Sequence, residues 1–282
     1  MKAAARDIRR FRCVLPLAAL ALGLCTAAAA QAQEVPESES LAASPAYLAA
    51  QTRWRNALAA FADTDRQQFP AAGGVLFVGS STIRMWNSLA QDFRQVPVVI
   101  NRGFGGSTMA DCSLFVRDLV VRYKPRQVLV YAGDNDLAEG RTPMQILESF
   151  AHFAAVLREE LPDTRISYIS IKPSPSRERL LPQVHEANNI ISAYIRTLAN
   201  SEYIDTFTPM LDEDGRPRAE LFRSDRLHLN DTGYRLWQSV IANHVPATPQ
   251  APLMAAHRAD APAPVPEPAE PVTTASAAAD PP

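Results

Sequence analysis

The sequence predicts an α/β fold, a three-layer α/β/α sandwich around a mainly parallel five-stranded sheet. Two observations favour this class. Short, wholly apolar runs rich in β-branched residues are typical of strands buried on both faces, as in a parallel sheet. Longer stretches with helical spacing lie between these runs, and such an alternation places helices on both faces of the sheet through right-handed crossovers.

The five expected strands follow from the apolar runs. The first run comes after a Gly-Gly pair, and the second has Pro97 at its entrance, where a strand tolerates proline. The last run is the weakest signal. In chain order the expected strands cover residues 75–78, 98–100, 127–131, 166–171 and 203–207.

The expected helices lie before, between and after these strands. Pro143 suits the first turn of the third helix, and Asn230 or Asp231 is available as an N-cap for the last one. In chain order the expected helices cover residues 46–66, 109–123, 143–160, 185–199 and 232–244.

We expect the folded domain at residues 45–245, because the chain begins with the sequence pattern of a signal peptide. Residues 1–32 resemble a secretory signal peptide, with basic residues, an apolar stretch over residues 14–24, and an A-x-A cleavage pattern at residues 30–32. The apolar stretch is shorter than the roughly 20 residues that a membrane span needs. We therefore expect export to the periplasm or the exterior, with residues 33–44 as a linker.

The C-terminal segment, residues 246–282, contains ten Pro and twelve Ala residues. It has few large apolar side chains to bury, so we expect it to be disordered or extended. The whole chain has a net charge of −2 and no basic run or stripe, which argues against a nucleic-acid partner. These patterns do not predict an oligomeric state.

Small and polar residues follow three of the predicted strands. The segments read G-S-S-T at 79–82, N-R-G-F-G-G-S at 101–107 and G-D-N-D at 133–136. A fourth polar segment, D-R-L-H at 225–228, precedes the last helix. Because ligands of open α/β sheets bind beyond the carboxyl ends of the strands, we expect these segments to form one site.

These segments contain the groups that acyl transfer from an ester requires. A serine hydroxyl needs a base to accept its proton, the base needs an orienting carboxylate, and the developing oxyanion needs hydrogen-bond donors. Asp225 and His228 are three residues apart and can meet within one turn, while Asn135 can supply a side-chain N–H. His185 is the rival base.

This ordered set resembles the SGNH (GDSL-type) hydrolase family over nearly all of residues 74–244, because the family's four sequence blocks centre on Ser, Gly, Asn and His. The resemblance implies the flavodoxin-like fold of that family. It implies Ser81 as the nucleophile, with Asp225 and His228 completing the triad. It also implies an oxyanion hole made of Ser81, Gly106 and Asn135.

Two positions in these blocks leave alternatives open. Gly105 is the runner-up to Gly106 as the oxyanion glycine. Ser80 occupies the position that the family usually gives to Asp, which removes an acid beside the nucleophile, and it remains a second candidate for the nucleophile itself.

The resemblance implies a serine esterase that hydrolyses carboxylic esters of short-acyl or lysophospholipid type through an acyl-enzyme, without a metal or an organic cofactor. The substrate would be a small-molecule, glycan or lipid ester. Two alternatives stay open. One is an O-acyltransferase or deacetylase that acts on cell-envelope or plant polysaccharide, and the other is a non-catalytic domain that binds glycans.

Further residues near these blocks have two interpretations each. Arg84 and Trp86 could line a substrate pocket, or they could serve a surface ion pair and the core. Asp134 and Asp136 offer too few oxygen ligands for a hard cation, so we expect Asp136 to brace its loop rather than bind a metal.

Overall fold

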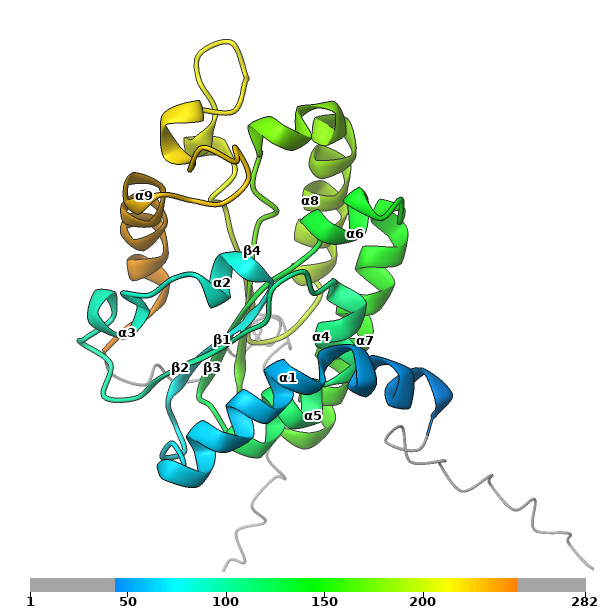
Figure 1. The fold of residues 1–282 in the computed structure, drawn as a ribbon, viewed down its shortest axis with the longest axis vertical. Helices are drawn as coiled ribbons and strands as arrows, with labels where there is room; N and C mark the ends of the chain where they lie inside the picture. The colour runs from blue at the N-terminus through cyan, green and yellow to red at the C-terminus, as the bar shows by residue number, and fades with distance from the viewer. Residues whose placement is uncertain (1–43, 248–282) are drawn as a thin grey trace, which may run out of the picture. The chain divides into compact units, whose positions relative to one another are not determined.

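The computed structural model describes residues 44–247, so the predicted signal peptide, all but the last residue of the predicted linker and the segment from residue 248 onward lie outside it. Five strands form one sheet in the order β2-β1-β3-β4-β5, and every neighbouring pair is parallel (Figure 1). The strands are β1 (Val75–Gly79), β2 (Val99–Gly103), β3 (Gln127–Tyr131), β4 (Arg165–Ile169) and β5 (Ser201–Ile204). The predicted fold class is confirmed.

Four long helices surround this sheet: α1 (Pro45–Gln67), α7 (Pro143–Glu160), α8 (Leu181–Ile195) and α9 (Asp231–Ile241). Shorter helices are α2 (Ser81–Arg84), α3 (Leu89–Asp92), α4 (Met109–Leu114), α5 (Val116–Leu119) and α6 (Asp134–Ala138). The expected helix over 109–123 is instead two short α-helices and a 3-10 turn. The breaks fall at Phe115 and Val120, and aromatic and β-branched side chains favour helix only weakly.

The sheet is buried on both faces, as the continuous apolar runs predict. Along β1, Leu76 and Val78 belong to the core under α4, α7 and α8, whereas Val75 and Phe77 belong to the core under α3 and α9. Figure 1 shows these helices on opposite sides of the strands. None of the helices within residues 44–247 is both long enough and apolar enough to span a membrane.

Helix α1 is fixed to the sandwich by polar contacts along its length. Near its start, Tyr47 Oη donates to Asp118 at 2.7 Å, and at its middle Trp54 Nε1 donates to Asp111 at 2.9 Å. Near its end, the buried carboxylate of Asp65 accepts hydrogen bonds from two side chains at 2.5 Å each, Arg102 of β2 and Tyr123. These contacts fix the helix to α4, α5, β2 and the turn that precedes β3.

Candidate active site

The chain turns sharply where β1 ends. Gly79 has a φ of 146°, and a Cβ at this position would lie 1.9 Å from the carbonyl oxygen of Tyr131, so only glycine fits between β1 and β3. Ser80 follows as the N-cap of α2, and Ser81 is the first residue of that helix. The turn therefore places Ser81 at the carboxyl edge of the sheet.

The structure brings Ser81, His228 and Asp225 into one hydrogen-bonded chain. His228 Nε2 lies 3.0 Å from Ser81 Oγ, and His228 Nδ1 lies 2.7 Å from Asp225 Oδ2. The second oxygen of Asp225 accepts the backbone N–H groups of Leu227 and His228, both at 2.9 Å. Both the carboxylate and the imidazole are thereby oriented toward the hydroxyl.

The hydrogen bonds of Asp225 also determine its protonation. Burial alone would raise the pKa of Asp225, but the N–H of His228, its imidazole and the N–H of Leu227 outweigh burial and lower the pKa to about 2. Asp225 is therefore a carboxylate throughout the neutral and mildly acidic range, as a group that stabilises an imidazolium must be.

Gly106 and Asn135 lie beside Ser81 in the same cleft. Gly106 has a φ of 85°, and within residues 44–247 no hydrogen-bond acceptor is assigned to its N–H or to that of Ser81. Asn135 Nδ2 donates to the carbonyl of Ser107 at 3.0 Å, while its Oδ1 accepts from Arg177 Nη2 at 2.9 Å. These two bonds fix which end of the amide is the donor.

A buried ion-pair network is connected to Asn135 through Arg177. Asp134 Oδ2 lies 2.8 Å from the buried Lys172 Nζ and 3.3 Å from Arg177 Nη1. Burial alone would raise the pKa of Asp134, but the charges of Lys172 and Arg177 outweigh it and lower the pKa. Lys172 also donates to Tyr131 Oη at 3.1 Å, so the network joins the ends of β3 and β4.

Asp136 joins the loop after β3 to the first turn of α4. Both of its carboxylate oxygens lie 3.0 Å from the backbone N–H of Met109. Burial raises the pKa of Asp136 to about 6, although this hydrogen bond opposes the shift. The contact agrees with the expected bracing role. No group of three or more His, Cys, Asp or Glu within residues 44–247 could hold a metal ion.

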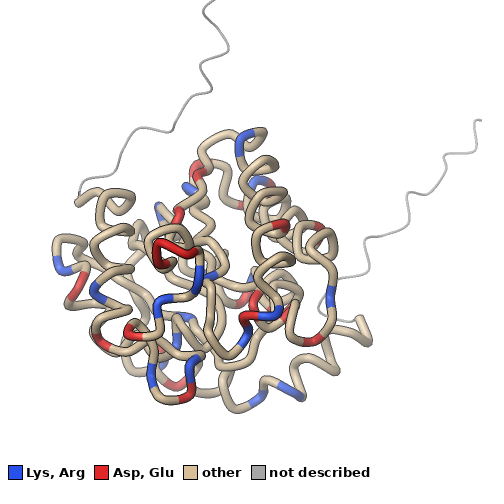
Figure 2. The backbone as a smooth tube through the Cα atoms, turned by 90° about the horizontal axis from the view of Figure 1, so that it is seen from above, with Lys and Arg blue, Asp and Glu red and all other residues tan. Residues whose placement is uncertain are grey.

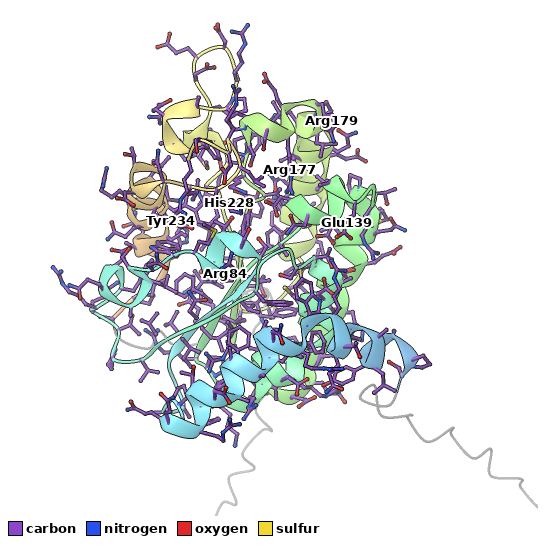
Figure 3. The ribbon with its side chains drawn as sticks, in the orientation of Figure 1. Arg84, Glu139, Arg177, Arg179, His228 and Tyr234 are labelled. Atoms are coloured by element: carbon purple, nitrogen blue, oxygen red, sulfur yellow. The ribbon has the colours of Figure 1, made fainter. Side chains whose placement is uncertain are left out.

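Ser81 opens onto a cleft of about 550 Å³. One wall comes from α1, whose Trp54 packs edge-on against Phe104 with ring centroids 5.0 Å apart. Arg53 of α1 and Arg84 of α2 also line the cleft. In Figure 3, Arg84 and His228 lie at the same end of the sheet, on α2 and on the loop before α9.

The interpretation of Trp86 as a pocket residue is wrong. Its side chain is 1% exposed, lies in the core between β1 and α9, and donates to Asp92 at 2.6 Å. Arg84, by contrast, is exposed and lines the cleft. Arg84 is the last residue of α2, whereas Trp86 lies beyond the end of that helix, where the chain turns back into the core. Ser80 is fully buried, and its hydroxyl has no hydrogen-bond partner in the described part of the chain.

A parallel α/β sandwich with a Ser-His-Asp chain at its carboxyl edge has the architecture of a serine hydrolase. A model of the GDSL-like Lipase/Acylhydrolase family matches residues 70–236, and this chain belongs to that family. It is therefore an enzyme that acts on ester bonds. The match begins after α1, so the helix that forms one wall of the cleft lies outside the matched segment.

Solved structures share the fold. A GDSL-like lipase from Bacteroides thetaiotaomicron is 22% identical, with a TM-score of 0.56 over 68% of this chain and 95% of that one. A G-D-S-L family member from Veillonella parvula is 17% identical, with a TM-score of 0.52 over 61% and 97%. A variant of an acetyl-xylooligosaccharide esterase from Geobacillus stearmophilus is 13% identical, with a TM-score of 0.51 over 61% and 94%. No curated protein matches.

Sequence patterns alone did not identify Arg177 or Trp54 as part of the site, nor the ion pair of Lys172 with Asp134. Arg177 and Lys172 act on Asn135 and Asp134 through tertiary contacts more than 35 residues away in sequence, which no spacing encodes. Trp54 had the helical spacing of an ordinary apolar position. His185, the rival base, instead packs edge-on against Phe207 with ring centroids 4.6 Å apart.

Proposed function

We propose that the protein is a serine esterase that hydrolyses short-acyl esters through an acyl-enzyme on Ser81. The observation that carries the proposal is the hydrogen-bonded chain from Ser81 Oγ through His228 to Asp225, which joins residues 147 positions apart in sequence. A hydroxyl 3.0 Å from an imidazole nitrogen is within the range at which general-base catalysis operates.

The first half of the reaction forms the acyl-enzyme. His228 Nε2 accepts the proton of Ser81 as Oγ bonds to the ester carbonyl carbon, and Asp225 stabilises the resulting imidazolium. The carbonyl oxygen becomes an oxyanion, which accepts from the N–H groups of Ser81 and Gly106 and from Asn135 Nδ2. The bond from carbon to the alcohol oxygen then breaks, and His228 gives its proton to the departing alcohol.

The second half releases the acid. A water molecule takes the place of the alcohol, and His228 accepts one of its protons as the water oxygen bonds to the acyl carbon. The second tetrahedral intermediate uses the same three donors. When the bond to Ser81 Oγ breaks, His228 returns the proton to the serine and the carboxylic acid leaves.

The lining of the cleft supports a short acyl chain. Its apolar side chains are those of Trp54, Ala57 and Leu227, while the other lining residues are polar, charged or glycine. Burial of each methylene of an acyl chain contributes roughly 0.8 kcal/mol where the methylene packs against apolar surface. Three apolar side chains offer a long acyl chain little such surface.

A chain-length series of p-nitrophenyl esters tests the proposal. We expect the highest kcat/KM with acetate or butyrate and a steep fall by octanoate. Ser81→Ala should lose at least about 10⁴-fold in kcat, because removal of a triad member leaves only binding and the oxyanion hole. Ser80→Ala is the matched control and should keep activity within a few-fold. A long-chain optimum would overturn the short-acyl preference, and an active Ser81→Ala enzyme would overturn the mechanism.

A further inference from the structure

The cleft beside Ser81 has a cationic lining. Arg53 and Arg84 are part of the lining, and among the described residues that form it none is Asp or Glu. Elsewhere the two signs of charge are interspersed along the chain, as Figure 2 shows. Two guanidinium groups therefore line the cleft without an acid in the same lining.

The guanidinium of Arg84 lies against the proposed oxyanion loop, although the residue is exposed. A Cβ on Gly105 would lie 2.8 Å from Arg84 Nε, and its nearest contacts would all be atoms of that guanidinium. Gly105 therefore lets the side chain pass directly over the backbone. The next residue in the chain is Gly106, so the charge lies beside the proposed oxyanion hole.

No acid among the described residues neutralises the charge of Arg84. None of the ion pairs formed among residues 44–247 includes Arg84. Arg53 differs, because it lies 3.3 Å from Glu139 and 4.7 Å from the centre of the Trp54 ring. Arg84 is thus the stronger candidate to bind an anion, and Arg53 adds a second positive charge across the cleft.

We propose that the cleft binds an ester that carries a carboxylate or phosphate group, with Arg84 as the residue that recognises the anion. The proposal rests on the esterase function proposed above, because it places the scissile carbonyl at Ser81. A guanidinium presents parallel N–H donors that match the paired oxygens of a carboxylate or phosphate, so Arg84 can bind either group through two hydrogen bonds.

Matched pairs of charged and neutral esters test the proposal. The carboxylate pair is 4-acetoxybenzoate and 4-acetoxybenzamide, and the phosphate pair is 1-acetylglycerol 3-phosphate and 1-acetylglycerol. Hydrogen bonds to charged groups typically change binding by roughly tenfold to hundredfold. We expect the wild type to favour the charged member of at least one pair by about tenfold in kcat/KM, and the pair it favours identifies the anion.

Three variants assign the preference to Arg84. Arg84→Gln should lose the preference, so that its kcat/KM falls about tenfold more on the charged esters than on their neutral partners. Arg84→Lys should keep a part of the preference, because it retains the charge but not the paired donors. Arg216→Gln is the matched control, since Arg216 is an exposed arginine that pairs with Asp214 and is not part of the cleft lining, and it should behave as wild type.

The outcomes separate this proposal from the esterase function. If wild type hydrolyses the neutral esters through Ser81 but shows no charge preference in either pair, the anion site is refuted and the esterase stands. The anion site is also refuted if Arg84→Gln slows charged and neutral esters equally, because Arg84 would then act on the reaction in general. If no ester is hydrolysed in a Ser81-dependent way, the esterase function itself fails.

Discussion

At the residue scale, the orientation of one amide decides whether the proposed oxyanion hole can work. Asn135 must present Nδ2, not Oδ1, to the substrate, because only the nitrogen can donate a hydrogen bond. Arg177 donates to Oδ1 and so excludes the flipped amide, in which two donors would face each other. Arg177 is therefore a positioning residue, which acts on the reaction through Asn135.

Substitution of Arg177 tests that role. Arg177→Ala should lower kcat about tenfold with little change in KM, because the amide loses its fixed orientation while the substrate contacts remain. Asn135→Ala should cost about 10²–10³-fold in kcat, the usual effect of losing an oxyanion donor. Exposed Arg179 supplies the control, and Arg179→Ala should match wild type. A selective rise in KM for Arg177→Ala would instead indicate a substrate contact.

At the element scale, α1 builds a wall of the cleft although it lies outside the segment that the family model matches. Its strongest attachment is the buried pair of Asp65 with Arg102, in which both side chains are less than a tenth exposed. Removing one member of such a pair leaves the other charge buried without its counter-ion. The wall therefore depends on a contact far from the chemistry.

Two aspartates on α1 give a controlled test of this attachment. Asp65→Ala should lower the free energy of unfolding by about 3–5 kcal/mol, because Arg102 is left buried and unpaired. Asp63 pairs on the surface with Arg66 of the same helix, and Asp63→Ala should change stability by no more than about 1 kcal/mol. Urea denaturation followed by circular dichroism measures both, and equal effects would contradict the account.

Also at this scale, the success of sequence reasoning varied with burial. The central strands β1 and β3 were located to within one residue, because both faces are buried and the whole run is apolar. The edge strand β5 was expected at 203–207 but begins at Ser201. Glu202 pairs with Arg165 and His244 there, so polar partners replace the apolar signal.

In the candidate site, the residues of local motifs were predictable from the sequence, whereas those that depend on tertiary contacts were not. The five proposed site residues were predictable because each belongs to a short local motif. Ser81, Gly106 and Asn135 follow strands, Asp225 and His228 precede α9, and the fold then brings the motifs together. The burial of Trp86 and the cleft position of Arg84 were not predictable, since they depend on how α2 and the turn after it pack in the folded chain. The supporting network likewise exists only through tertiary contacts.

At the scale of the whole molecule, Asp136 couples stability to pH. Its pKa of about 6 in the folded state lies above the ordinary value near 4, so the folded protein binds more protons than the unfolded chain between these pH values. The free energy of unfolding should therefore fall as the pH rises from about 4 to 6, by up to about 3 kcal/mol from this group.

The variant Asp136→Asn isolates this effect, because the amide oxygen can still accept the Met109 N–H but does not titrate. Urea unfolding at several pH values gives the difference in stability between wild type and variant, in which the other titrating groups cancel. We expect wild type to lose stability relative to the variant as the pH rises from 4 to 7. A constant difference, or one that moves the other way, would contradict the burial-raised pKa.

The central claim is that Ser81, and not its neighbour Ser80, is the nucleophile. Labelling with a fluorophosphonate probe tests it most directly, since the probe bonds covalently to an activated serine. Trypsin releases residues 67–84 as one peptide that contains both serines, so fragment masses must locate the adduct. We expect the adduct on Ser81 in wild type and in Ser80→Ala, and none in Ser81→Ala. An adduct on Ser80, or an active wild type that remains unlabelled, would contradict the account.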